Sequence, residues 1–109
     1  MFPEISDANS RPWIPGPYPG VDLCLLEKDP STGGLTVLRR FHQGITVPAH
    51  THPLADEFVY ILSGEWEEEG EIYGTGSVLR VPRGVRHGPH HARTEVISLT
   101  RFNGPLTVS

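Results

Sequence analysis

Apolar and polar residues alternate in short runs along most of the chain, and the runs are separated by glycine, proline and other turn-forming residues. Alternation with a period of two is typical of a β-strand, because successive side chains point to opposite faces. The pattern predicts strands at 21–27, 35–41, 45–52, 57–63, 65–69, 77–81 and 95–102. Short strands at this spacing indicate a sandwich or a barrel. The sequence therefore predicts an all-β fold.

The predicted strand at 57–63 is largely apolar on both faces. Glu57, Val59, Ile61 and Ser63 share one face, and Phe58, Tyr60 and Leu62 share the other. A strand that is apolar on both sides needs a cover over the outer face of its sheet. We expect the N-terminal segment or a second subunit to provide it, and we predict a homodimer.

Residues 1–20 differ from the rest of the chain, because prolines at positions 3, 12, 15, 17 and 19 leave few backbone donors for a sheet. This segment is predicted to be an extended arm that packs on a sheet or on a partner subunit. Residues 21–109 are predicted to form one domain, since 109 residues suffice for a single core. Twelve glycines and eleven prolines disfavour long helices.

Charge and composition exclude several classes of protein. The net charge of −4, without a basic stripe, disfavours nucleic-acid binding. No stretch approaches the roughly 18 apolar residues of a membrane span, and the N-terminus lacks the features of a signal peptide. Cys24 is the only cysteine, so an internal disulfide is excluded, and we expect its side chain to be buried. We therefore predict a cytoplasmic protein that does not bind membranes.

Candidate metal ligands cluster in one part of the sequence. His50 and His52 fall on one face of the predicted strand 45–52, about 7 Å apart along it. Residues 53–56 offer a turn, after which Glu57 opens a strand that can run back antiparallel beside the histidines. His87 follows later in the chain and offers another imidazole. These residue types at this spacing predict a metal site.

The two segments that hold these residues resemble the paired signature motifs of the cupin superfamily. They read G-x5-H-T-H-x4-E-x6-G at 44–64 and G-x5-P-R-G-x2-H at 76–87. The one departure is His91, where the second motif of the family usually ends in Asn. The resemblance implies a double-stranded β-helix, or jelly-roll barrel, and a homodimer. It implies a metal held by His50, His52, Glu57 and His87, with turns shaped by Gly64, Gly76, Pro82 and Gly84.

Two further likenesses narrow the family. Residues 13–21 and 64–76 resemble the cupin domain of ChrR-type anti-sigma factors. In that family a zinc-binding helical domain precedes the cupin and binds the sigma factor. The residues before the cupin here could not form such a domain, so we expect no sigma-binding role. A shorter likeness at 102–106 is to cupins that cleave diketones with iron and dioxygen.

The ligand set suits one divalent Fe, Mn, Ni, Co or Zn ion per chain. Four protein ligands leave two positions open on an octahedral iron, manganese or nickel ion, but they saturate a tetrahedral zinc ion. The first hypothesis is therefore a metal-dependent enzyme that acts on a small oxygen-bearing organic substrate. The family resemblance makes dioxygenase-like chemistry the first choice of reaction, and isomerase or lyase chemistry the second. The alternative is a non-catalytic zinc-binding sensory or ligand-binding module. No residue is assigned as a general acid or base.

Other polar residues are interpreted more simply. We interpret His42, His90 and His91 as ordinary polar residues outside the site, with His42 exposed. The alternative for His90 and His91 is that one of them lines the mouth of the pocket or holds a metal ligand in place. The strand arginines Arg39, Arg80 and Arg101 are predicted to point outward and pair with surface glutamates, the alternative being an inward arginine that binds a substrate carboxylate. The run at 67–69 is interpreted as a solvated hairpin tip, and Tyr60 and Trp66 as packing residues.

Overall fold

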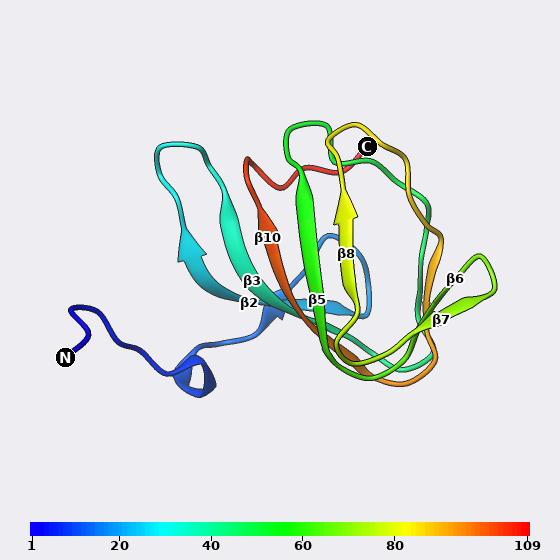
Figure 1. Ribbon diagram of the computed structural model, residues 1–109, viewed down its shortest axis with the longest axis horizontal. Helices are drawn as coiled ribbons and strands as arrows, with labels where there is room; N and C mark the ends of the chain where they lie inside the picture. Colours follow the sequence, from blue (N-terminus) through cyan, green and yellow to red (C-terminus); the bar gives the residue numbers. More distant parts are fainter.

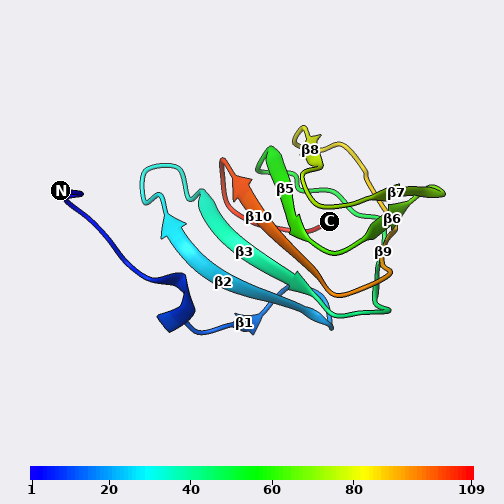
Figure 2. The same cartoon turned by 60° about the horizontal axis from the view of Figure 1, so that its bottom comes forward.

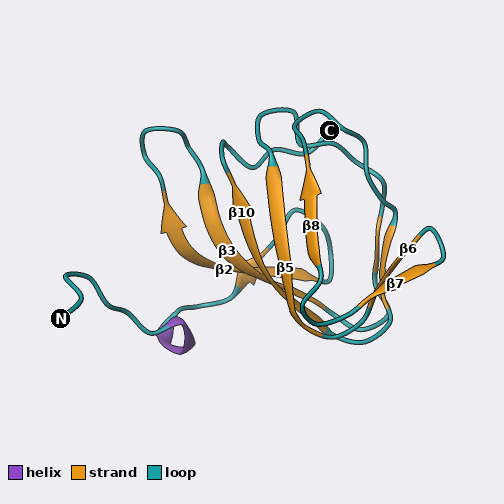
Figure 3. Ribbon diagram, in the orientation of Figure 1, coloured by secondary structure: helices purple, strands orange, loops and turns teal.

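The computed structural model describes all residues 1–109, and almost all of its regular structure is strand (Figure 1, Figure 3). The elements are η1 (Ala8–Ser10), β1 (Ile14–Pro15), β2 (Val21–Lys28), β3 (Leu35–Phe41), β4 (Thr46–Val47), β5 (Glu57–Ser63), β6 (Trp66–Glu68), β7 (Glu71–Tyr73), β8 (Val78–Val81), β9 (His90–Ala92) and β10 (Val96–Phe102). No helix of the structure has the length and apolar character needed to cross a membrane. The predicted all-β fold is confirmed.

The strands form two antiparallel sheets that face each other (Figure 1, Figure 2). The larger has the order β1-β2-β3-β10-β5-β8, and the smaller has the order β4-β9-β6-β7. Neighbours in each sheet are mostly distant in sequence, so the chain crosses between the sheets repeatedly. One consequence is that β5 lies between β10 and β8 and does not pair with the segment that carries His50 and His52. The expected antiparallel pairing of these segments is therefore wrong, and Glu57 approaches the histidines from the opposite sheet.

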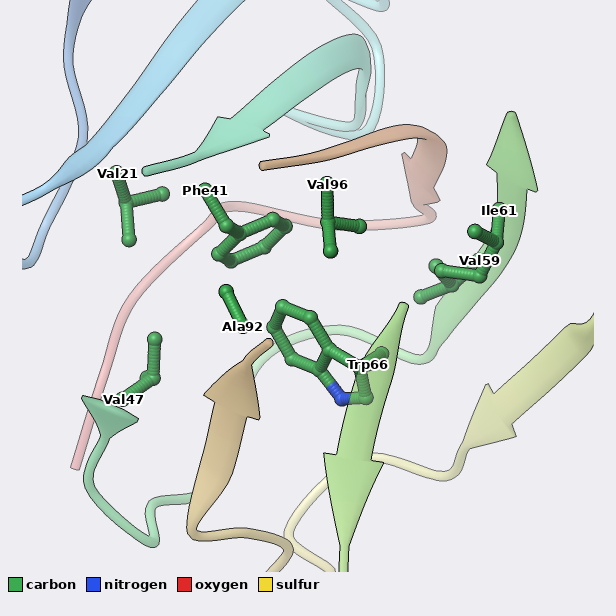
Figure 4. Close-up of a cluster of buried hydrophobic side chains, with 8 residues drawn as sticks. All are labelled: Val21, Phe41, Val47, Val59, Ile61, Trp66, Ala92 and Val96. Carbon is green, nitrogen blue, oxygen red and sulfur yellow. The ribbon is translucent and has the colours of Figure 1, made fainter. Parts of the chain in front are cut away.

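The core lies between the two sheets. Its larger cluster consists of Val21, Phe41, Val47, Val59, Ile61, Trp66, Ala92 and Val96 (Figure 4). The rings of Phe41 and Trp66 meet edge to face, with centroids 4.3 Å apart, which joins β3 of one sheet to β6 of the other. Trp66 is therefore a packing residue, as predicted.

The two faces of β5 differ in exposure. Val59 and Ile61 are buried in the core, whereas Phe58, Tyr60 and Leu62 are 46%, 38% and 41% exposed on the outer face. The N-terminal arm does not cover this outer face, so that part of the expectation is wrong. The homodimer stays a prediction.

The arm lies instead at the far edge of the larger sheet. There β1 pairs with β2, and Ile14 lies opposite Leu23 (Figure 2). The ring of Trp13 lies 4.4 Å from the guanidinium carbon of Arg40 on β3. Cys24 is fully buried, as expected, and its Sγ lies 3.9 Å from the carbonyl oxygen of Ala8.

The strands at 21–27, 35–41, 57–63 and 95–102 are confirmed to within a residue at either end. The predicted strand 45–52 is wrong in its extent, because β4 contains only Thr46 and Val47. Pro48 follows, and it has no backbone N–H to continue a ladder. Further along, His50 and His87 exchange two backbone hydrogen bonds of 2.9 Å in an isolated bridge. That bridge brings the two predicted ligand segments together.

Candidate metal centre

The four predicted ligands converge on a cavity of about 650 Å³ between the sheets. Glu57 is the first residue of β5 and reaches the cavity from the larger sheet. His50 and His87 come from the segments joined by the isolated bridge, and their ring centroids are 4.3 Å apart. The ring of His52 lies 4.8 Å from that of His50 and 5.1 Å from that of His87. The predicted residues therefore line one pocket, together with apolar side chains of both sheets.

Three buried polar atoms in this pocket face one another without a hydrogen-bond partner. Glu57 Oε1 lies 3.0 Å from His52 Nε2 and 3.6 Å from His87 Nε2, yet none of the three atoms makes an aligned hydrogen bond. An unsatisfied buried polar atom costs about 1–3 kcal/mol. A divalent cation would satisfy all three atoms at once. The residues present therefore fit a metal ion.

The opposite edges of the three histidine rings are anchored to the backbone. Each ring has its Nδ1 atom next to a backbone carbonyl oxygen. The distances are 2.7 Å from His50 to Pro48, 2.9 Å from His52 to Thr107 and 3.1 Å from His87 to Val85. A carbonyl oxygen only accepts, so each Nδ1 carries the proton and donates it. Each Nε2 atom is left with a lone pair, which is the arrangement found behind metal-binding histidines.

Arg39 points into the cavity, so the prediction of an outward arginine paired with a surface glutamate is wrong for this residue. Its Nη2 donates to Glu57 Oε2 at 2.8 Å, and its Nε donates to Thr100 Oγ1 at 3.1 Å. The guanidinium also lies over the rings of Phe41 and Phe102. Arg39 thus fixes one carboxylate oxygen of Glu57 and leaves the other facing the histidines.

This environment sets the charge of Glu57. Burial acts to raise its pKa, but the nearby Arg39 guanidinium and the contacts with His52 and His87 outweigh it and hold the pKa of Glu57 well below its usual value. The carboxylate is therefore ionised at neutral pH. A negatively charged oxygen is the form that binds a cation.

The histidines respond to burial differently. Burial lowers the pKa of His50, and the positive charges of neighbouring histidines add to this effect. For His87, burial also acts to lower the pKa, but the Glu57 carboxylate and the Val85 carbonyl outweigh it and raise the pKa. The lowered pKa keeps His50 neutral at pH 7, the form that ligates metals.

A fourth imidazole, His90 on β9, also lines the cavity, so its interpretation as a residue outside the site is wrong and the alternative holds. Its Nδ1 lies 3.0 Å from Glu68 Oε2, and burial lowers the pKa of His90 to about 3. His91 is the next residue, so it points away from the cavity, where its Nδ1 lies 3.0 Å from Thr46 Oγ1.

Glu68 and Arg39 are further functional candidates that sequence reasoning placed wrongly. Glu68 is not part of a solvated tip, since it contacts His90 and accepts a 3.1 Å hydrogen bond from the backbone N–H of Gly88. The turn itself is Glu69-Gly70, between β6 and β7. The sequence offers one indication that Glu68 points inward: it lies two residues after the buried Trp66, and residues at this spacing share one face of a strand.

The remaining candidates lie outside the pocket or at its border. His42 is half exposed and contacts Asp22 at 2.7 Å, as its predicted surface position implied. Arg101 points outward as predicted, although its partner is the hydroxyl of Thr36, at 3.0 Å, and not a glutamate. Arg80 is exposed at the edge of the cavity.

Comparisons with known proteins agree with this fold. The sequence matches the model of the ChrR cupin-like domain family over residues 3–107. Among proteins of curated function, none matches this sequence. The solved structure of an RmlC-like cupin from Ralstonia eutropha JMP134 superposes with a TM-score of 0.76 at 23% identity, covering 94% of this chain and 76% of that one.

Two further solved structures represent different functions on this fold. An acetylacetone dioxygenase from Acinetobacter johnsonii superposes with a TM-score of 0.72 at 23% identity, over 97% of this chain and 75% of that one. The anti-sigma factor ChrR from Rhodobacter sphaeroides, solved in complex with SigE, gives a TM-score of 0.68 at 22% identity, over 86% of this chain and 49% of the other. The predicted jelly-roll barrel is confirmed, and likenesses at this level of identity show the fold alone.

Proposed function

Because the chain belongs to the ChrR cupin-like domain family, we propose that it is a small metal-binding cupin with one divalent ion per chain. The proposed protein ligands are His50, His52, Glu57 and His87. The observation that carries the proposal is the group of three buried atoms, from His52, Glu57 and His87, that face one another without hydrogen-bond partners. Three imidazoles and a carboxylate suit Fe, Mn, Ni, Co or Zn.

The proposed activity is that of a metal-dependent enzyme, dioxygenase-like in its chemistry, on a small oxygen-bearing organic substrate. The cavity of about 650 Å³ lies within the range of small-molecule sites. The acetylacetone dioxygenase among the structural neighbours supports this choice of reaction class. When bound, the ion would supply a Lewis acid and open positions for oxygen ligands.

The residues around the ligands would bind and orient the substrate. Apolar side chains from both sheets, such as Val59 and Phe41, line the cavity and limit the size of the bound molecule. Arg39 lies on the cavity wall, where its charge is paired with Glu57 at 2.8 Å and holds this carboxylate in place. The substrate would therefore need oxygen atoms of its own that can bind the ion. Small enolisable diketones and 2-oxo acids meet both requirements.

The test is elemental analysis of protein purified anaerobically without a metal-affinity tag, followed by dioxygen uptake with acetylacetone and a panel of small 2-oxo acids. We expect near-stoichiometric iron, manganese or nickel and uptake that depends on the added compound. The matched control is His52→Ala, which we expect to show neither metal nor uptake. Stoichiometric zinc that resists exchange, without uptake, would contradict the enzyme and favour a zinc-binding sensory module. Absence of metal would contradict the centre itself.

A further inference from the structure

The cavity holds one imidazole more than the proposed ligand set uses. The possible ligand atoms fall into two groups, His52 with Glu57 and His87, and His50 with His87 and His90. Within each group the atoms lie no more than 4.8 Å apart, and the two groups share His87. His50 therefore groups with His90 and not with Glu57.

The orientation of His90 matches that of the proposed ligands. Its Nδ1 edge faces an acceptor, as in the other three histidines, but the acceptor is the carboxylate of Glu68 at 3.0 Å. No hydrogen bond engages its Nε2 atom, and its ring centroid lies 5.3 Å from that of His87 and 5.7 Å from that of His50. The Nε2 atom of His90 therefore has no hydrogen-bond partner, and His90 belongs to the group of possible ligands that contains His50 and His87.

Glu68 is itself held in place. Its Oε1 accepts from the backbone N–H of Gly88 at 3.1 Å, while its Oε2 contacts His90. A carboxylate behind an imidazole fixes the tautomer and the ring orientation, and it makes the other nitrogen a stronger ligand. This is the arrangement that recurs behind metal-binding histidines.

From this geometry we infer that His90 is a fifth protein ligand of the metal centre and that Glu68 positions it. The inference rests on the proposed function, because it concerns the same ion. Five protein ligands would leave one open position on a six-coordinate ion in place of two. A set of four imidazoles and one carboxylate also shifts the preference toward imidazole-binding ions such as iron, cobalt, nickel and zinc and away from ions that favour oxygen ligands.

The experiment uses Co(II) as the probe, because its visible absorption responds to the number and type of its ligands. Apo-protein is loaded with Co(II), and affinity is measured by competition with a chelator. We expect His90→Ala to lower the affinity by tenfold or more and to change the spectrum. Glu68→Gln should lower the affinity in the same direction but by less. His91→Ala is the matched control, since His91 is the adjacent residue on the outward face, and it should behave like the wild type.

The outcomes separate this inference from the proposed function. If His52→Ala loses Co(II) while His90→Ala keeps the wild-type spectrum and affinity, His90 is not a ligand and only this inference is overturned. If both variants keep the ion, the proposed centre itself fails. X-ray absorption of the Co(II)-loaded wild-type chain provides a measurement that does not depend on how the variants fold. We expect scattering from four imidazoles, and three would overturn the inference.

Discussion

At the scale of single residues, Glu57 is the side chain on which the centre depends most. One oxygen is held by Arg39 at 2.8 Å, and the other faces the ring nitrogens of His52 and His87. The arginine therefore does two things: it orients the carboxylate and it keeps the carboxylate ionised. Its contribution is measurable because another strand arginine, Arg101, points to the outer surface.

Arg39→Met should weaken metal binding most at acidic pH. Arg39 keeps the pKa of Glu57 well below its usual value of 4.5, so its removal raises that pKa. A proton then competes with the ion for the carboxylate at a higher pH, and the pH at which the ion is lost moves upward. We expect affinity at neutral pH to fall about 10- to 100-fold, as for loss of other groups that support a ligand.

The measurement is Co(II) or Zn(II) affinity as a function of pH, with Arg101→Met as the control. Identical pH profiles for the two variants would show that the Arg39–Glu57 contact has no influence on the ion.

His52→Ala should lower metal occupancy sharply, whereas His42→Ala should leave it unchanged. His52 is buried in the cavity, and its Nε2 lies among the three partnerless atoms. His42 is half exposed and bound to Asp22. Removal of a group that supports a ligand lowers metal affinity about 10- to 100-fold, and we expect His52→Ala to lower it by more than that. Metal-to-chain ratios of both variants check this, and equal ratios would refute the ligand assignment.

The sequence could predict which residues meet in the pocket because the spacing of histidines and glutamate follows a known motif. It could not place Arg39, Glu68 and His90. Their roles depend on which face of a strand points inward and on partners from other parts of the chain. For Arg39 the partner, Glu57, is 18 residues away. For His90 the partner, Glu68, lies on a neighbouring strand of only three residues.

At the scale of elements, runs of alternating apolar and polar residues predicted most of the strands. The strands β3 and β5 each have seven residues, and their bounds follow from the sequence alone. The strand β6 has three residues and lies within the predicted strand 65–69, whereas β7 and β9, which also have three residues each, were not predicted. The predicted strand 45–52 failed where Pro48 interrupts the ladder.

The turn after β5 depends on Gly64, and its replacement should destabilise the protein. Gly64 has a φ of +94°, and a Cβ there would lie 2.1 Å from the carbonyl oxygen of Glu95. Gly64→Ala therefore combines backbone strain with a steric clash. Gly76 is a matched control, since its φ is +90° but a Cβ there would meet no atom within 4 Å.

We expect Gly76→Ala to cost about 1–2 kcal/mol of unfolding free energy from the left-handed conformation alone. Gly64→Ala should cost clearly more, because a backbone carbonyl cannot move aside as a flexible side chain can. Chemical denaturation of both variants measures the difference. Equal losses would mean that the chain relaxes around the added methyl group.

At the scale of the whole molecule, the exposed face of β5 supports the predicted homodimer. Phe58, Tyr60 and Leu62 form an apolar row on the outer side of the larger sheet, next to the exposed Val78 of β8. An exposed apolar patch of this kind is typical of an interface between subunits. The arm does not cover it, since β1 lies at the opposite edge of the same sheet.

Phe58→Glu should weaken self-association. A charge within the row would have to be buried without a partner in the dimer. We expect the dissociation constant to rise by tenfold or more, which corresponds to about 1.4 kcal/mol. Analytical ultracentrifugation measures it, with Ile72→Glu as the control, because Ile72 is similarly exposed but belongs to β7 of the other sheet. A wild-type chain that is monomeric at high concentration would contradict the homodimer.

The metal centre is tested by a crystal structure of the metal-loaded protein, with anomalous diffraction measured on both sides of the absorption edge of the ion. We expect one anomalous peak per chain within about 2.0–2.2 Å of Glu57 Oε1 and of the Nε2 atoms of His52 and His87. A pocket with no peak, in which these three atoms hydrogen-bond to one another or to water, would show that they do not form a metal centre.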